Sequence, residues 1–267
     1  MAHHIGEASK ADYSKLGKLR VLLAEDNELN QYLLRGLMES WGFVVHTADN
    51  GIEALELFQK NDYDVLLFDL QMPEMGGMEA MKLIRGYHNL HKCHVPIIAL
   101  SANVETGEAE KHIAMGFNDF LVKPVEEETL FQQIAVQTST SLLYKPKTEE
   151  NKTPETPLQI DRAALLNKFH NNSAFVDHLL KLFVETTPEA LAALRLHHNN
   201  QDFEKLQAAA HKLKTTIDTF KIVTLQETIR KIESYAGQKS DLEQLSELIN
   251  HTTEVLMLII DRLDHNR

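Results

Sequence analysis

The sequence lacks the features that mark secreted, membrane-spanning and nucleic-acid-binding proteins. Its single cysteine, Cys93, cannot form an intramolecular disulfide, and no apolar stretch of signal-peptide length stands at the N-terminus. The longest apolar run near the C-terminus, 255–260, is far shorter than the ~20 residues that cross a bilayer. Lys and Arg number 27 against 39 Asp and Glu, and they form no cluster that would hold a phosphate backbone. We therefore expect a cytoplasmic protein with no membrane segment in this chain and no nucleic-acid partner.

Glycine becomes scarce halfway along the chain. Short apolar runs alternate with amphipathic stretches over 18–138, whereas after residue 160 the pattern is helical throughout and Gly237 is the only glycine. Residues 139–158 hold three prolines and six Ser or Thr, a composition typical of a linker. We predict a disordered or expression-derived tail over 1–17, a first domain over 18–138, a linker over 139–158 and a second domain over 159–267.

The first domain shows strict alternation of strand and helix patterns. This alternation predicts a doubly wound α/β fold, in which helices cover both faces of a five-stranded parallel sheet. The expected strands are 19–24, 43–47, 65–68, 96–100 and 119–122, and the expected helices are 28–40, 51–60, 78–85, 105–114 and 126–136. The second domain shows only helical periodicity, over 161–168, 174–198, 202–219, 222–235 and 241–263, which predicts an all-α four-helix bundle.

Polar side chains end the predicted strands of the first domain. Glu25 and Asp26 follow the first strand, Asp69 the third, Ser101 the fourth and Lys123 the fifth. Because the carboxyl ends of parallel strands meet at one edge, these groups should converge there. Three carboxylates repel one another, and a divalent cation with hard oxygen ligands, most plausibly Mg²⁺, relieves that repulsion. Such a site suits in-line phosphoryl transfer onto a carboxylate, with the ammonium and the hydroxyl holding phosphoryl oxygens.

This domain resembles the receiver domain of two-component response regulators, which has a flavodoxin-like fold. The resemblance lies in VLLAEDN (21–27), VLLFDLQMPEMGG (65–77), PIIALSAN (96–103) and FNDFLVKPV (117–125). It implies a phosphoacceptor, a magnesium site, a hydroxyl and an aromatic that switch together, and a lysine that bridges to the phosphoryl group. The residues at these positions are Asp69 as phosphoacceptor; Glu25, Asp26, Asp69 and the backbone carbonyl of Gln71 as Mg²⁺ ligands; Ser101 and Phe120 as the switch pair; and Lys123 as the bridge.

A second group of ligand-type residues precedes the fourth strand. His88, His91, Cys93 and His94 have the chemistry and the short spacing of a Zn²⁺ or Ni²⁺ site. No distant second ligand pair accompanies them, and the segment has the pattern of an exposed turn that Pro96 closes. We interpret these histidines as surface residues.

One helical segment of the second domain, 202–220, places a histidine away from its apolar face. The apolar stripe is formed by Phe203, Leu206, Ala210, Leu213 and Ile217. His211 lies ~120° from the centre of this stripe at 100° per residue, on a face shared with Lys214, Thr215 and Asp218. An exposed neutral imidazole is a competent nucleophile toward an acyl phosphate, and Lys214 on the same side can neutralise phosphoryl oxygens.

The segment AHKLK (210–214) resembles the His-x-x-Lys motif of histidine-containing phosphotransfer domains. The resemblance implies that His211 is the phosphorylated residue and that Lys214 assists it. Two positions depart from the family, which usually has glycine where this chain has Thr215 and Lys221. Thr215 lies one turn beyond the histidine, where its side chain would partly shield the imidazole.

Together these features predict a phosphorelay intermediate. Asp69 would receive a phosphoryl group from an upstream histidine kinase, and His211 would exchange it with a downstream receiver. The chain has no P-loop or other Gly-rich nucleotide-binding segment, so we do not expect it to phosphorylate itself from ATP. Two alternatives are the C-terminal portion of a hybrid sensor histidine kinase and a scaffold that phosphorylation of Asp69 gates without transfer to histidine.

Overall fold

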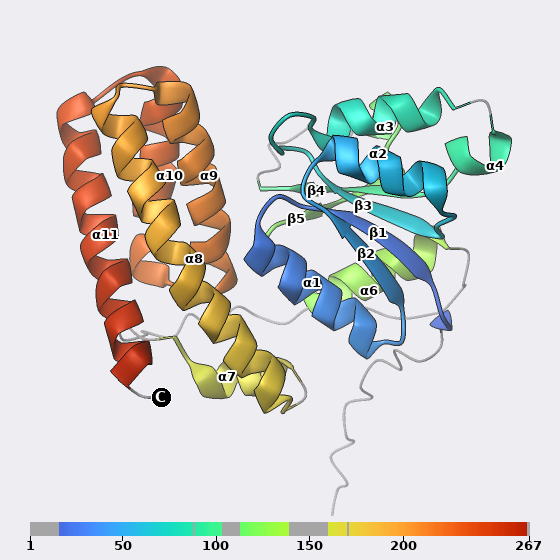
Figure 1. Ribbon diagram of the computed structural model, residues 1–267, viewed down its shortest axis with the longest axis horizontal. Coiled ribbons are helices and arrows are strands. Elements are labelled where there is room, and N and C mark those ends of the chain that lie inside the picture. Colours follow the sequence, from blue (N-terminus) through green and yellow to red (C-terminus); the bar gives the residue numbers. More distant parts are fainter. Residues whose placement is uncertain (1–15, 88, 103–112, 139–159, 170, 266–267) are drawn as a thin grey trace, which may run out of the picture. The chain divides into compact units, whose positions relative to one another are not determined.

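The computed structural model describes residues 16–87, 89–102, 113–138, 160–169 and 171–265. They form two compact units: one contains the strands, and the other contains the helices after residue 160 together with residues 27–36 (Figure 1). None of the helices in these ranges has the length and apolar character that a membrane span needs. The predicted linker, 139–158, and nearly all of the predicted tail, 1–17, lie outside the described residues, and the predicted domain boundaries stay predictions.

The first unit contains the five-stranded parallel sheet that the sequence predicts. Its strand order is β2-β1-β3-β4-β5, and every neighbouring pair is parallel. The strands are β1 Arg20–Ala24, β2 Val44–Ala48, β3 Val65–Asp69, β4 Ile97–Ser101 and β5 Asp119–Val122. From β1 the chain runs first to β2 on one side and then to β3 on the other, so β1 and β3 flank the point where the order reverses. In sheets of this kind, the ligand site lies at that point, outside the carboxyl ends of the strands.

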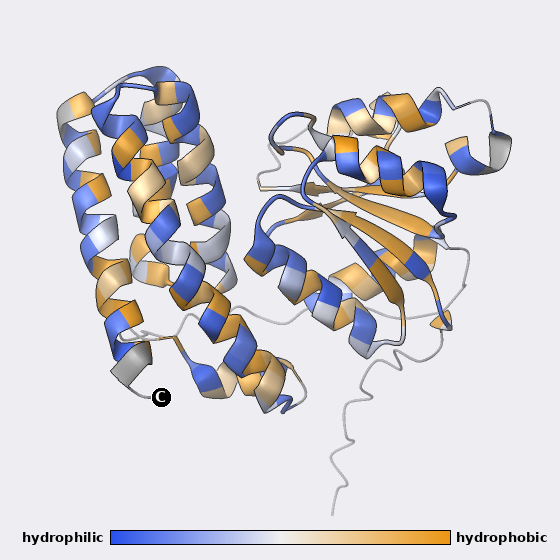
Figure 2. Cartoon of the chain, viewed as in Figure 1, coloured by the Kyte–Doolittle hydropathy of each residue, from blue (hydrophilic) through white to orange (hydrophobic). Residues whose placement is uncertain are grey.

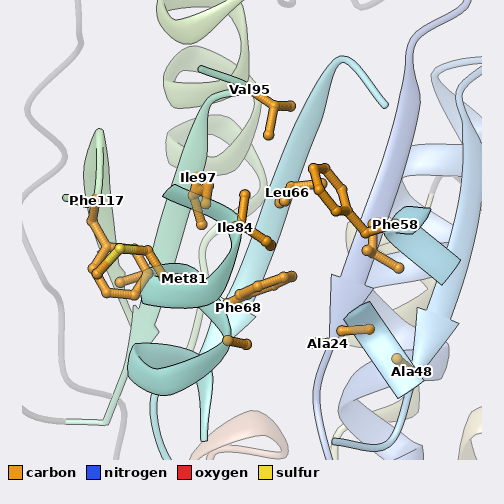
Figure 3. Close-up of a cluster of buried hydrophobic side chains, with 14 residues drawn as sticks. Ala24, Ala48, Phe58, Leu66, Phe68, Met81, Ile84, Val95, Ile97 and Phe117 are labelled. Atoms are coloured by element: carbon orange, nitrogen blue, oxygen red, sulfur yellow. The ribbon is translucent and has the colours of Figure 1, made fainter. Parts of the chain in front are cut away.

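The apolar character of the central strands explains why the sheet is covered on both faces. Every residue of β3 and β4 is buried, as parallel strands with helices on both sides require (Figure 2). On one face, Phe58 of helix α2 (Gly51–Lys60) and Met81 and Ile84 of α3 (Gly77–Arg85) surround Phe68 of β3 (Figure 3). This cluster fixes β3, whose last residue is Asp69.

The opposite face carries α1 (Glu28–Ser40) and α6 (Glu127–Gln137) (Figure 1). Trp41, which follows α1, packs edge-on against Phe131 of α6 with the ring centroids 5.3 Å apart. The predicted helix 105–114 falls largely outside the described residues. One prediction is wrong in detail: a short helix, α4 (Leu90–Cys93), stands where we expected an exposed turn, and its last residue, Cys93, is buried.

The second unit is all-helical, as predicted. Its helices are α7 Arg162–Lys168, α8 Ser173–Asn199, α9 Phe203–Thr219, α10 Val223–Gln238 and α11 Leu242–His265. Asp161, Asn172 and Asp202 cap the starts of α7, α8 and α9 by accepting backbone hydrogen bonds in the first turn. The core is built from apolar residues of α8 to α11, among them Leu179, Phe183, Leu206, Leu213, Ile217, Ile229, Ile232, Leu245 and Leu256.

A three-residue connection joins α9 to α10, and its geometry places the two helices side by side. The Ile222 amide donates to the Ile217 carbonyl and the Lys221 amide to the Asp218 carbonyl, at 3.0 and 3.1 Å. This pair of bonds ends a helix with a left-handed residue, and Lys221 takes that conformation at φ 52°. The position is one of the two where the phosphotransfer family usually has glycine.

Candidate functional site

Carboxylates converge at the end of β1 and β3. Glu25 and Asp26 follow β1 directly, and Asp69 ends β3, which pairs with β1. Glu25 is 1% exposed and Asp69 3% exposed. Each of the three side chains offers an oxygen atom that lies within 4.8 Å of the other two. Among the described residues, this is the one group of His, Cys, Asp or Glu side chains that could hold a metal ion. Hard oxygen ligands at this separation fit a magnesium ion.

Lys123 lies against two of these carboxylates. Its Nζ is 2.5 Å from Glu25 Oε2 and 2.5 Å from Asp69 Oδ2. Burial alone would lower the pKa of the Lys123 ammonium, but the charges of Glu25 and Asp69 and their hydrogen bonds raise that pKa above its ordinary value. Lys123 is therefore a permanent cation inside an otherwise anionic site, where it can neutralise part of the charge on an incoming phosphoryl group.

The remaining predicted residues of this site lie on the same edge. The Gln71 amide donates to Asp69 Oδ1 at 3.0 Å, so the loop after β3 orients the carboxylate. Ser101 is buried at the end of β4, and its carbonyl accepts from the Lys123 amide at 2.7 Å. In the pairing of β4 with β5, Ala99 lies opposite Phe120. Ser101 is two residues after Ala99 in β4, so the side chains of Ser101 and Phe120 lie on the same face of the sheet. Their coupling, and the role of the Gln71 carbonyl, stay predictions.

A close approach of backbone to backbone fixes the loop that follows Asp69. A Cβ atom at Gly77, the first residue of α3, would lie 2.2 Å from the Asp69 carbonyl oxygen. Only glycine fits there, because no side-chain rotation can relieve a clash that involves Cβ and a main-chain oxygen. The second glycine of the PEMGG segment is thus required for the main-chain contact that positions Asp69.

In the second unit, His211 does not project into solvent as we expected. Its side chain is 12% exposed, and Nδ1 lies 2.6 Å from Oε1 of Glu233 on α10. The ring's other nitrogen, Nε2, is buried and has no hydrogen-bond partner among the described residues. The Glu233 carboxylate accepts the hydrogen bond from Nδ1–H, so the ring's lone pair lies on Nε2, which is the tautomer that an imidazole nucleophile needs.

Lys214 shares the carboxylate that holds the histidine. Its Nζ is 2.5 Å from Glu233 Oε2, so His211 and Lys214 meet at one group, as their spacing on α9 allows. Burial alone would raise the pKa of Glu233, but hydrogen bonds from His211 and Lys214 lower it below its ordinary value. The Thr215 hydroxyl donates to the carbonyl of His211 at 3.1 Å and is thus held on the main chain.

The helix face that carries His211 packs partly on α10. Asp218, two turns beyond His211, pairs with Arg230 of α10 at 2.8 Å, and burial raises the pKa of Asp218 despite that partner. The hydrophobic stripe is confirmed, since Leu206, Ala210, Leu213 and Ile217 are buried and Phe203 is partly buried. Periodicity located the stripe, but it gave no information on which neighbouring helix would cover the polar side. Glu233 was missed for this reason: only its position on a helix following the histidine would have suggested it.

The alternative group of metal ligands is only partly described. His88 and the side chain of His91 lie outside the described residues, and Cys93 Sγ lies 3.1 Å from His94 Nδ1. No metal-competent group includes Cys93 or His94 within the part of the chain that the structure describes.

Comparison with known families now identifies both regions. Residues 21–135 match the response regulator receiver domain, and residues 178–265 match the Hpt domain. The chain contains a receiver domain followed by an Hpt domain. These two domains together indicate phosphorelay signalling. The receiver match covers the sheet with Glu25, Asp69 and Lys123, and the Hpt match covers α9 and α10 with His211 and Glu233.

Relatives that align with most of this chain include a sensor protein and a signal transduction histidine-protein kinase. The sensor protein GacS of Pseudomonas syringae pv. syringae is 26% identical over 225 residues, which are 83% of this chain and 25% of GacS. The signal transduction histidine-protein kinase BarA of Escherichia coli K12 is 28% identical over 259 residues, 91% of this chain and 27% of BarA. The chain therefore spans about a quarter of the length of these relatives.

Solved structures also resemble the receiver. The receiver domain of sensor histidine kinase PA1611 from Pseudomonas aeruginosa PAO1, which has a magnesium ion coordinated in its active-site cleft, is 32% identical with a TM-score of 0.42, covering 46% of this chain and 99% of that one. The receiver domain of the Francisella response regulator 1452 is 28% identical with a TM-score of 0.43, covering 46% of this chain and 98% of that one.

Proposed function

We propose that Asp69 and His211 are the two phosphorylated residues of this chain, and that the chain passes phosphoryl groups between them or between partner proteins. The observation that supports this most directly is that each residue sits beside a lysine and a carboxylate. Asp69 has Lys123 and Glu25, and His211 has Lys214 and Glu233. In both sites, the cation can hold phosphoryl oxygens while the carboxylate fixes the groups around the acceptor.

The first step would form an acyl phosphate in the receiver. A carboxylate oxygen of Asp69 attacks the phosphorus of a phosphohistidine donor, the P–N bond breaks, and the donor imidazole keeps the electron pair. Lys123, which already contacts Asp69, would bind one oxygen of the new phosphoryl group. The Ser101 hydroxyl would contact a second phosphoryl oxygen. The change at Ser101 would then draw Phe120 inward, so phosphorylation would bias two states of this face.

A magnesium ion fits this site. Glu25, Asp26 and Asp69 would hold it, together with the carbonyl of Gln71, and Lys123 alone leaves the cluster with excess negative charge. When bound, the ion would neutralise charge that develops on the transferred phosphoryl group.

The second step would move the phosphoryl group to the Hpt domain. Nε2 of His211 attacks the acyl phosphate, the P–O bond to Asp69 breaks, and the aspartate leaves as a carboxylate. Nδ1 keeps its proton, and Glu233 balances the positive charge that the ring acquires when Nε2 is bonded to phosphorus. Lys214 would exchange its contact with Glu233 for one with a phosphoryl oxygen.

The partners would be an upstream histidine kinase and a downstream receiver, and the site of action the cytoplasm. Because relatives such as GacS and BarA are about four times longer, we infer that this pair of domains serves the same relay as the corresponding part of a hybrid sensor kinase. Similarity to both domains in one relative supports this reading over an isolated response regulator.

The experiment is to offer acetyl phosphate and Mg²⁺ to the full chain and to map the label. Phosphoaspartate is labile in base and phosphohistidine in acid, so the two sites are separable. Asp69→Asn should abolish all labelling, and His211→Gln should leave only the base-labile label. Asp62→Asn and His251→Gln, which alter exposed residues, should label like the parent chain. Labelling of Asp69→Asn in excess EDTA would contradict the assignment, and a parent chain that never labels histidine would favour a gated scaffold.

A further inference from the structure

The polar face of α9 continues one turn beyond His211 toward the start of the helix. Gln207 is four residues before His211, so the two side chains lie on the same face of α9. On α10, Gly237 is four residues after Glu233. One turn of α9 thus faces one turn of α10, with the His211–Glu233 contact at one end.

The other end of this pair of turns is occupied by the Gln207 amide. A Cβ atom at Gly237 would lie 2.7 Å from Gln207 Nε2, 3.1 Å from its Cδ and 3.3 Å from its Oε1. The whole amide group therefore lies against the bare backbone of Gly237. The Gln207 side chain is exposed, and no hydrogen bond of its amide is found among the residues that the structure describes.

Gly237 has no role in ending its helix. The left-handed residue after α10 is Lys239, at φ 52°, and Gly237 has no positive φ. Glycine is among the least favourable residues inside a helix, and this is the only glycine after residue 160. The neighbour that accounts for glycine at position 237 is the Gln207 side chain, which a Cβ atom there would meet.

We propose that the Gln207 amide is an additional phosphoryl-binding group of the Hpt site, and that Gly237 exists to place it. Helical side chains lean toward the helix N-terminus, so the His211 imidazole leans over the turn that carries Gln207. With Nδ1 held by Glu233, a phosphoryl group on Nε2 has Lys214 on the C-terminal side of the histidine and Gln207 on the N-terminal side. Gln207 Nε2 donates to one phosphoryl oxygen and is a catalytic residue in the sense that it touches the transferred group.

This inference rests on His211 being the phosphorylated histidine, and the test separates the two claims. The probe is phosphoramidate, whose P–N bond breaks with release of ammonia as Nε2 bonds to phosphorus. The full chain carries Asp69→Asn, so that the receiver does not compete for the probe. Phosphohistidine is followed by ³¹P NMR. Adding His211→Gln to this background must abolish the signal; a signal that persists there, or its absence from the Asp69→Asn chain itself, would overturn the proposed function.

Three variants then test Gln207. In the Asp69→Asn chain, Gln207→Ala should slow labelling of His211 about three- to tenfold, the value of one hydrogen bond. Gln207→Glu should be slower still, because a carboxylate repels the phosphoryl group, whereas a merely structural glutamine would tolerate glutamate better than alanine. The matched control is Gln238→Ala, whose side chain bonds Ser234 on α10, and it should label at the rate of the Asp69→Asn chain.

Gly237→Ala should change stability and labelling rate in opposite directions. The added methyl group displaces the end of a flexible side chain, so alanine should raise Tm through its higher helix propensity while it slows labelling about as much as Gln207→Ala does. Labelling of Gln207→Ala and Gln207→Glu at the rate of the Asp69→Asn chain would overturn the inference while leaving His211 assigned. A loss in Gln238→Ala equal to that in Gln207→Ala would overturn it as well.

Discussion

The receiver and Hpt sites hold their reactive groups by different means. In the receiver, strand ends and main-chain contacts carry Asp69 and Lys123, and both side chains are buried. In the Hpt domain, a side chain from a neighbouring helix, Glu233, orients His211 on a helix surface. The first arrangement depends on the topology of one sheet, and the second depends on which helices pack together. Substitutions should therefore change the free energy of unfolding most where buried charges are paired, and least at the end of a helix.

The largest effect is expected for Lys123→Met in the receiver. Methionine keeps the length of the side chain but removes the charge, which leaves Glu25 and Asp69 buried beside each other without a cation. Breaking a buried pair in this way should lower the free energy of unfolding by about 3 to 5 kcal/mol at pH 7 without divalent ions. Mg²⁺ should restore part of the loss.

The fluorescence of Trp41, the one tryptophan, reports unfolding of the receiver in urea. The control is Lys60→Met, which removes an exposed contact of 3.4 Å with Glu56 and should change the free energy of unfolding by less than about 1 kcal/mol. Equal losses in the two variants would mean that the buried cluster is no more stabilising than a surface pair.

A smaller effect should follow from Gly77→Ala, which tests the contribution of the backbone. The added methyl group would meet the Asp69 carbonyl oxygen at 2.2 Å, so α3 or the phosphoacceptor loop has to move. Overpacking of this kind should cost about 1 to 3 kcal/mol and slow phosphorylation of Asp69. Gly86→Ala is the control, because its nearest neighbours would lie at 3.5 Å or more. Trp41 fluorescence in urea and labelling by acetyl phosphate measure the two effects.

The receiver site was predictable from the sequence to a greater extent than the Hpt site. The order of apolar runs was sufficient for the parallel sheet, and strand ends were sufficient to bring Glu25, Asp69 and Lys123 together, because carboxyl ends of parallel strands meet at one edge. Helical periodicity located the buried stripe of α9. It could not reveal Glu233 or the covered environment of Lys214, because periodicity of one helix contains no information on its neighbour's register.

In the Hpt domain, Glu233→Gln should alter how stability depends on pH. Hydrogen bonds from His211 and Lys214 hold the pKa of Glu233 below its ordinary value of 4.5. A carboxyl group of lowered pKa stabilises the folded state above the unfolded pKa, and this contribution is lost as the pH falls through 4.5 toward the folded-state pKa. The variant should thus be less stable than the parent near pH 7, and the difference should shrink with acid.

The measurement is urea unfolding followed by far-UV circular dichroism. Trp41 fluorescence reports unfolding of the receiver, so the transition that is seen by circular dichroism and not by Trp41 belongs to the Hpt domain. The control is Glu227→Gln, which alters an exposed pair with Lys231 on the same helix and should change stability little at any pH. A stability difference for Glu233→Gln that stays constant from pH 7 to pH 4 would contradict the proposed charge state.

The smallest effect concerns Lys221, where the Hpt family usually has glycine. Lysine is held there in the left-handed conformation at φ 52°, which ends α9 more than two turns beyond His211. Lys221→Gly should therefore raise the free energy of unfolding by about 0.5 to 1 kcal/mol, because glycine adopts that conformation without crowding of Cβ. The rate of His211 labelling should be unchanged, since this position shapes the helix end rather than the phosphoryl site. Lys181→Gly in the interior of α8 is the control and should lower stability by about 1 kcal/mol. If Lys221→Gly instead accelerated labelling, the glycine of the family would have a chemical role that the helix ending does not explain.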